Sequence, residues 1–342
     1  MNGVTRAMDL TSTGLQSLGF TVFANVGSTA TNYFPETEFT YSDGTYTSAT
    51  KYYWPSSGTL DFFAYQYSEQ DYNTVSHTAL TKAFTVTPST NVDNQTDLLI
   101  AYTTGKDKAT YGASGVSLNF RHAESMVTIK LKNTSTTTTI TVGAVELGNV
   151  YTTGTYTFTG STNNAEDPTL DPDTDDSNTG YYLKYTDWSS QSTLGSYSKT
   201  PYPTEYTSAV AVSEAYKMIL IPQTLTHADA YASASAGAVF SGSYIKMPLK
   251  IQNTTGGAYI VGAASGEGEY VTALWPLPAT QWLPGYHYTY TVDLAGGGYY
   301  PTNQNTDAGL DPILAGAEIK FVSVTVDSWP YPEIGINVPS TE

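Results

Sequence analysis

The sequence of 342 residues contains no cysteine, and only 13% of its residues are charged. Without cysteine the chain has no disulfide, no thiolate metal ligand and no cysteine nucleophile. The charged share is about half that of an average globular protein. The sequence contains no run of about 18 apolar residues, the length that a helix needs to cross a membrane. These absences exclude redox chemistry on thiols and a helical membrane span within the sequence.

Basic side chains are scarce as well. The chain carries 14 Lys and Arg against 31 Asp and Glu, a net charge of −17. Such a surface repels the phosphates of nucleic acids and the headgroups of anionic lipids. We therefore expect no nucleic-acid partner.

Threonine, serine, glycine and 29 tyrosines supply the polar surface instead. Threonine and tyrosine favour strands, and glycine and proline mark turns. The segment Met126–Lys132 shows the pattern, because Val127, Ile129 and Leu131 alternate with polar residues. The composition predicts an all-β protein. Its length exceeds the needs of one β-sandwich, and so predicts two domains.

Strand-like segments bounded by turn residues cover most of the chain. They are Gly19–Val26, Thr47–Trp54, Thr59–Tyr67, Lys82–Thr87, Asp97–Thr103, Val116–Lys132, Thr139–Val150, Met218–Pro222, Ser243–Gln252, Tyr270–Leu277, Gly285–Leu294 and Glu318–Trp329. Short helical turns are expected in Met8–Leu18, Ser208–Ala215 and Asn305–Ala315. The apolar pattern breaks after Asn133, which predicts an N-terminal domain of residues 1–135 and a C-terminal domain of residues 136–342.

Six segments, in order along the chain, resemble the signature of one family. They are Tyr52-Tyr53-Trp54-Pro55 with Leu60-Asp61-Phe62-Phe63-Ala64-Tyr65, Asp97-Leu98-Leu99-Ile100-Ala101, Leu118-Asn119-Phe120-Arg121-His122-Ala123, Leu220-Ile221-Pro222-Gln223, Trp282-Leu283-Pro284-Gly285-Tyr286, and Val324-Thr325-Val326 before Trp329. Together they are similar to the fimbrillins of the Bacteroidales, the FimA and Mfa type of pilus subunit. That resemblance implies two transthyretin-like β-sandwich domains in tandem.

The resemblance also implies a mode of assembly. A proteolysed N-terminal segment vacates a groove in the N-terminal sandwich, and a strand of a neighbouring subunit fills it. Members of this family are matured by a trypsin-like cut near the N-terminus, and Arg6–Ala7 is the matching bond here. An incidental terminal arginine is the alternative. The family is usually exported through a lipobox cysteine, which this sequence lacks, so we expect the export signal and the lipobox to lie outside it.

The C-terminus is the expected donor of the exchanged strand. Two alternating segments supply side chains at the spacing of a strand groove. The donor candidates are Phe321, Val322, Val324 and Val326, and in the tail Ile334, Ile336 and Val338.

An acidic loop provides the one metal candidate in the sequence. Asp171, Asp173 and Asp175 have the spacing that lets alternate carboxylates converge on calcium. Pro172 and the missing glutamate at the twelfth loop position depart from an EF-hand. We expect a solvated loop and no cofactor, with calcium as the alternative.

For the aromatic residues and the histidines we expect a role in packing and not in catalysis. Trp54, Phe62 and Tyr65 could form a sugar platform, but core packing is the expected role of these aromatic residues. His77, His122, His227 and His287 have no metal-ligand spacing, and no nucleophile motif accompanies His122. We expect no catalytic residues.

The sequence therefore predicts a non-enzymatic pilus subunit on the cell surface, associated with the outer membrane and assembled with other pilin subunits for adhesion. A carbohydrate-binding adhesive module, such as a tip subunit, is the alternative, and a glycan-active hydrolase is a third hypothesis. Stalk, tip and anchor roles are not distinguished by the sequence, and neither is the adhesive ligand.

Overall fold

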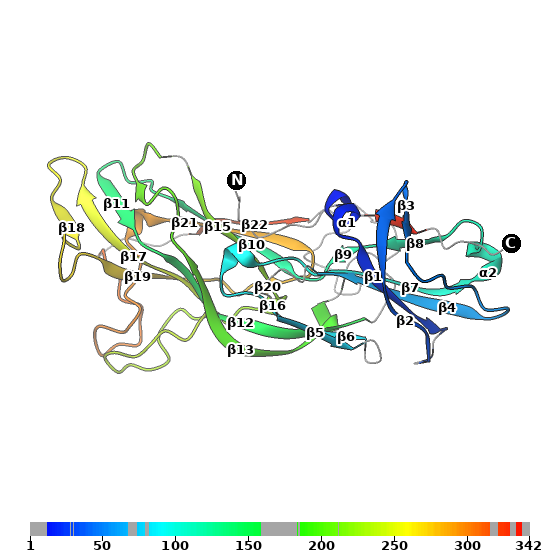
Figure 1. Cartoon of the computed structure of the whole chain (residues 1–342). Helices are drawn as coiled ribbons and strands as arrows, with labels where there is room; N and C mark the ends of the chain where they lie inside the picture. The colour runs from blue at the N-terminus through cyan, green and yellow to red at the C-terminus, as the bar shows by residue number, and fades with distance from the viewer. Residues whose placement is uncertain are drawn as a thin grey trace.

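The computed structural model describes residues 12–27, 29, 31–67, 74–78, 82–158, 183, 185–210, 212–314, 321–328 and 333–336. Figure 1 shows an elongated molecule built almost entirely of strands. The all-β prediction is confirmed. Two short α-helices occur in the described part, α1 (Ser12–Leu18) and α2 (Lys108–Tyr111).

A 6-stranded sheet forms one end of the molecule. Its order is β3 (Thr45–Thr47), β2 (Asn32–Ser42), β1 (Phe20–Val26), β4 (Thr59–Gln66), β7 (Leu99–Asp107) and β9 (Arg121–His122). In β4, every residue from Leu60 to Tyr65 is buried, because both faces of this strand are covered. Leu60, Phe62 and Ala64 pack into one core with α1, and Phe63 and Tyr65 pack into another. The aromatic segment Leu60–Tyr65 therefore belongs to a central strand.

The rest of the molecule contains a 4-stranded and a 9-stranded sheet that share a core. The 4-stranded sheet is ordered β15 (Ser213–Leu220), β10 (Ser125–Lys132), β21 (Tyr286–Asp293) and β22 (Phe321–Ser328). The 9-stranded sheet contains β14 (Glu205–Tyr206), β11 (Thr138–Val142), β17 (Tyr244–Asn253), β12 (Val145–Thr157), β6 (Ala83–Thr87) and β5 (Thr74–Thr78), with β13 (Trp188–Lys199), β18 (Tyr259–Val261) and β19 (Val271–Pro276). Side chains from both sheets interdigitate in one large cluster around Trp275 and Trp282. A short ladder of β16 (Gln223–Thr224) with β20 (Gln281–Trp282) lies beside it.

Strand pairing crosses the position at which the sequence predicts a domain boundary. β10 precedes residue 135 and pairs with β15 and β21, while β6 pairs with β12. β8 (Val116–Asn119) pairs with β23 (Glu333–Ile336) from the other end of the chain. The division into residues 1–135 and 136–342 stays a prediction.

Several expected elements are wrong. Residues 48–55 form no strand, because Tyr52 and Trp54 pack against the core while the backbone runs without a partner strand. The expected strand Val116–Lys132 is broken into β8, β9 and β10, since the chain leaves one sheet at Ala123 and enters another at Ser125. Of the three expected helical turns, the structure contains the one that ends at Leu18. Residues 213–215 begin β15, and residues 305–314 contain no helix.

Candidate functional site

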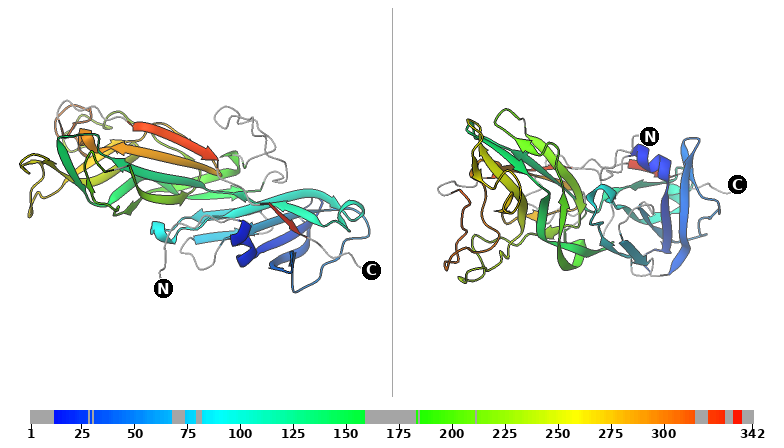
Figure 2. Two further views of the ribbon diagram at one scale, coloured as in Figure 1. Left: turned by 90° about the horizontal axis from the view of Figure 1, so that it is seen from above. Right: turned by 60° about the vertical axis from the view of Figure 1, so that its left-hand side comes forward.

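The short strand β8 presents an edge near one end of the molecule. Among the described strands, β23 is its one hydrogen-bonded partner, and the two run antiparallel. The register places Ile334 opposite Leu118 and Ile336 opposite Val116. β23 also lies against β3, so it bridges the gap between β8 and the end of the 6-stranded sheet (Figure 1). Figure 2 shows the same red strand beside the blue and cyan strands.

This pairing joins two segments that are far apart in the sequence. β22 ends at Ser328 in the 4-stranded sheet, and β23 begins at Glu333 on β8, with four residues between them. The C-terminal strand therefore lies on the N-terminal part of its own chain.

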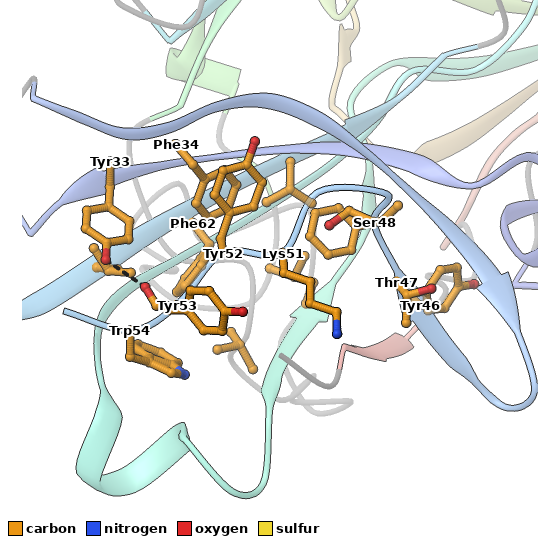
Figure 3. Close-up of a pocket in the computed structure, with 15 residues that line it drawn as sticks. Tyr33, Phe34, Tyr46, Thr47, Ser48, Lys51, Tyr52, Tyr53, Trp54 and Phe62 are labelled. Atoms are coloured by element: carbon orange, nitrogen blue, oxygen red, sulfur yellow. Dashed lines mark hydrogen bonds between the residues drawn. The ribbon is translucent and has the colours of Figure 1, made fainter. Parts of the chain in front are cut away.

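A cavity of about 110 Å³ opens beside β8. Val116 and Leu118 form one wall, and the other walls come from β1 to β4 and the segment after β3. The remaining lining residues are Val22, Tyr33, Phe34, Phe39, Tyr46, Thr47, Ser48, Lys51, Tyr52, Tyr53, Trp54, Leu60 and Phe62. Figure 3 shows that aromatic rings dominate this lining.

Ring packing holds the walls in place. Tyr52 stacks on Phe34 with ring centroids 4.5 Å apart, and Trp54 meets Phe62 edge-on at 5.9 Å. The Tyr33 hydroxyl donates a hydrogen bond of 2.6 Å to the Tyr53 carbonyl (Figure 3). The segment that carries Tyr52, Tyr53 and Trp54 is thereby fixed without a strand ladder.

The donor candidates lie on two different strands. Phe321, Val322, Val324 and Val326 belong to β22, where Phe321 pairs with Val292, Val324 with Tyr290 and Val326 with Tyr288. Val324 is 38% exposed. Ile334 and Ile336 lie on β23. β22 is thus an edge strand of its own sheet, and β23 already forms the kind of ladder that strand donation requires.

Several candidate residues lie outside the described residues. They are Arg6 and Ala7 of the processing site, Val338 of the donor tail, and Asp171, Asp173 and Asp175 of the calcium candidate. Their roles stay predictions.

His122 lies in a fully buried polar cluster where the two parts of the molecule join. Its Nδ1 contacts the Asp97 carboxylate, and both side chains are 0% exposed. Glu124 Oε2 accepts a hydrogen bond of 3.0 Å from the Leu98 amide. Burial raises the pKa of Glu124 well above its usual value, and the Asp97 charge adds to the shift. With no exposed surface, this cluster is closed to a substrate.

His287 and His227 make their contacts outside this cluster. His287 contacts the Thr128 hydroxyl at 2.8 Å, and His227 lies 2.9 Å from Asp229. No group of three His, Asp or Glu side chains among the described residues could hold a metal ion.

The aromatic residues proposed for a sugar platform are mostly core residues. Phe62 and Tyr65 are 5% and 6% exposed. Trp54 lies at the cavity instead. Sequence reasoning missed Val116 and Leu118 as an acceptor edge, although their alternation with polar neighbours is visible in the sequence.

Comparison with known proteins decides the family. A family model described as fimbrillin-like matches residues 5–329. The chain belongs to the fimbrillin-like family. The resemblance of the six sequence segments is thereby confirmed.

Similar solved structures come from Bacteroides uniformis and Porphyromonas gingivalis. One, described as a candidate cell adhesion protein of Bacteroides uniformis, is 16% identical, with 91% of this chain and 92% of that chain covered and a TM-score of 0.42. The tip fimbrial protein Mfa3 of Porphyromonas gingivalis is 8% identical, with 91% and 94% covered and a TM-score of 0.34. The fimbrial anchor protein Mfa2 of the same organism is 10% identical, with 92% and 90% covered and a TM-score of 0.34. No curated protein matches this chain.

Within its described part, the fimbrillin-like chain has no helix of the length and apolarity that a membrane span requires.

Proposed function

We propose that this fimbrillin-like chain is a non-enzymatic subunit of a cell-surface pilus and polymerises by strand exchange. The observation that carries the proposal is the antiparallel ladder of β23 on β8. An exposed strand edge is unstable alone, and a complementary strand stabilises it through backbone hydrogen bonds. When β23 of a neighbouring subunit takes the same position, every contact of the ladder is kept. The short connection from β22 makes this exchange a domain swap.

Donor and acceptor on one chain favour a repeating role. A stalk subunit must offer both surfaces, whereas a subunit at the end of a filament needs one of them. The register of β23 on β8 indicates that the two surfaces of this chain fit each other. We therefore propose a stalk-forming subunit whose partner is a second copy of the same chain, located on the outer surface of the cell and used in adhesion.

Proteolysis would start the exchange. In this proposal, residues before Ala7 and whatever lies upstream occupy an edge groove of the N-terminal sandwich until the Arg6–Ala7 bond is cut, and only then does the chain exchange β23 with a neighbour. The chain has two arginines, and Arg121 is 1% exposed. A protease specific for arginine should therefore cut the folded protein near its N-terminus alone, where exposed chain ends are most easily cleaved.

The test uses the full chain with its native upstream residues. After treatment with an arginine-specific protease, the parent should form SDS-resistant ladders, while Arg6→Ala should remain monomeric. Deletion of Tyr331–Glu342 from the cleaved protein should abolish the ladders without changing the circular dichroism spectrum. Polymerisation of the deleted protein would place the donor elsewhere.

A point variant sharpens the assignment of the donor strand. Ile334→Asp puts a charge opposite Leu118, which is 1% exposed, and should prevent ladder formation. Val324→Asp on β22, at a position that is 38% exposed, is the matched control and should still polymerise. Equal loss in both variants would argue against β23 as the donor.

A further inference from the structure

The cavity beside β8 has the size of a small-molecule site. Its volume is about 110 Å³, somewhat below the approximately 150 Å³ of an apolar protein cavity that binds benzene. Its inner walls are apolar and come from four strands. They include Val22, Phe34, Leu60, Phe62 and Leu118, each at most 5% exposed. An occupant would have to present an apolar group about as large as a phenyl ring.

One positive charge, that of Lys51, lies at this cavity. Lys51 is exposed and makes no ion pair or hydrogen bond within the described part of the chain. Two lysines on β17 differ. Lys246 lies 3.1 Å from Glu146, and Lys250 lies 2.8 Å from Glu269. In a chain of net charge −17, a lysine without an acidic neighbour beside an apolar cavity favours an anion.

A buried donor lies on the same wall. The Trp54 indole nitrogen is buried and has no hydrogen-bond partner among the described residues. This nitrogen has almost no accessible surface, so a ligand in the cavity does not reach it, and the contact to an anion rests on Lys51. Figure 3 shows Lys51 and Trp54 at this wall, with the Tyr53 ring between them in that view.

Three hydroxyl groups of the lining are already engaged. The Tyr33 hydroxyl donates to the Tyr53 carbonyl, Tyr52 shares a hydrogen bond of 3.1 Å with Thr37, and Ser48 donates to the Thr50 carbonyl at 2.6 Å. A sugar needs polar partners around its whole ring, whereas the inner walls here are mostly apolar. A phosphate would meet one lysine without a second cation in the lining.

We propose that this cavity binds a small monocarboxylic acid with an apolar body, such as an arylalkanoic or branched-chain acid. The apolar body fills the space between Phe34, Phe62 and Leu118, and the carboxylate meets Lys51. Binding is measured on the uncleaved monomer, in which β23 pairs with β8, so a negative result here is distinct from a failure of strand exchange.

The experiment titrates the uncleaved protein with three probes by ligand-observed NMR. The acid 3-phenylpropionate should bind with a Kd on the order of 1 mM, as expected for about eleven non-hydrogen atoms in a small site. The neutral 3-phenylpropanol should bind more weakly, and acetate should not bind at about 20 mM. Equal binding of the acid and the alcohol, or no binding of the acid at about 20 mM, would overturn the proposal.

Three variants locate the site. Lys51→Met keeps the aliphatic stem and should weaken binding of the acid about three- to fivefold, the range of a solvent-exposed ion pair, while binding of the alcohol stays within about twofold. Trp54→Phe keeps an aromatic ring and removes an N–H that does not open to the cavity, so binding of the acid should stay within about twofold. Lys108→Met removes another exposed lysine, on α2, and should change nothing. An equal effect of Lys51→Met and Lys108→Met would mean a non-specific charge effect and would refute the site.

Discussion

At the residue scale, the Tyr46 hydroxyl is a buried polar group that lacks a hydrogen-bond partner in the described structure. Tyr46 is 2% exposed, and burial raises its pKa to about 12, so the hydroxyl is neutral at physiological pH. Tyr46→Phe removes this unpaired group and keeps the ring. We expect the free energy of unfolding to rise by about 1 kcal/mol, measured by urea denaturation.

A second tyrosine provides the matched control. The Tyr288 hydroxyl accepts a hydrogen bond of 2.8 Å from the Leu283 amide and donates one of 2.9 Å to the Gln281 carbonyl. Tyr288→Phe leaves both groups without this partner and should lower stability by about 1–3 kcal/mol. If both variants destabilise the protein equally, the Tyr46 hydroxyl has a partner in solution.

Glu124 gives stability a dependence on pH. Burial is the main cause of its raised pKa in the folded protein, and the Asp97 charge is the second. The folded state therefore retains this proton at pH values where the unfolded state has lost it. The resulting stabilisation is complete below the ordinary glutamate pKa and is lost as the pH rises through the folded pKa.

Glu124→Gln resembles the protonated carboxyl and should remove that dependence. We expect similar unfolding free energies for parent and variant near about pH 4, and a growing advantage of the variant as the pH rises. Urea denaturation from about pH 4 to about pH 9 measures the difference, with the exposed Glu38→Gln as the control. Parallel pH profiles of parent and Glu124→Gln would show that Glu124 is ionised in the folded protein.

At the element scale, the turn between α1 and β1 depends on Gly19. Its φ is +73°, and its amide donates a hydrogen bond of 2.8 Å to the Leu15 carbonyl. A Cβ at this position would lie 2.6 Å from the backbone oxygen of Phe39. Gly19→Ala combines a strained backbone with a collision that a side-chain rotation cannot relieve. We expect a loss of about 2–4 kcal/mol in urea denaturation.

Gly44 separates these two effects. It has a φ of +84° in the turn between β2 and β3, and a Cβ added there would have no atom within 4 Å. Gly44→Ala should therefore lower the free energy of unfolding by about 1 kcal/mol, which is the cost of the backbone conformation alone. A loss as large as that of Gly19→Ala would mean that the Phe39 contact contributes nothing.

The sequence predicted strands correctly where apolar residues alternate with polar ones and the apolar residues are buried. Val127, Ile129 and Leu131 are fully buried on β10, as their spacing predicts. It failed for residues 48–55, since aromatic residues favour any packed surface and do not by themselves supply a partner strand. It also missed the breaks around Ala123, because the amide there bonds to the Leu98 carbonyl, a contact set by tertiary structure.

At the scale of the whole molecule, the decisive contacts join distant parts of the chain. β10 pairs in parallel with β21, and Met126 lies opposite His287. Neither this pairing nor the return of β23 to β8 has a local signal, because period-two patterns fix which face is buried and leave the partner open. The β8 part of the candidate site was therefore missed, while Ile334 and Ile336 of β23 were already among the donor candidates, whose role stays a prediction.

These long-range contacts predict cooperative unfolding. β6 pairs with β12, and β23 pairs with β8. The buried side-chain amide of Gln95 donates a hydrogen bond of 2.9 Å to the Ser89 carbonyl and accepts one of 2.8 Å from the Ile219 amide. It therefore links segments on the two sides of the predicted domain boundary. We expect the monomer to melt in one calorimetric transition with equal calorimetric and van't Hoff enthalpies. Gln95→Leu leaves the Ile219 amide without this partner, and should lower stability by about 1–3 kcal/mol and Tm by a few degrees. Two resolved transitions in the parent would mean that the parts fold independently, and Gln95→Leu would then shift one of them alone.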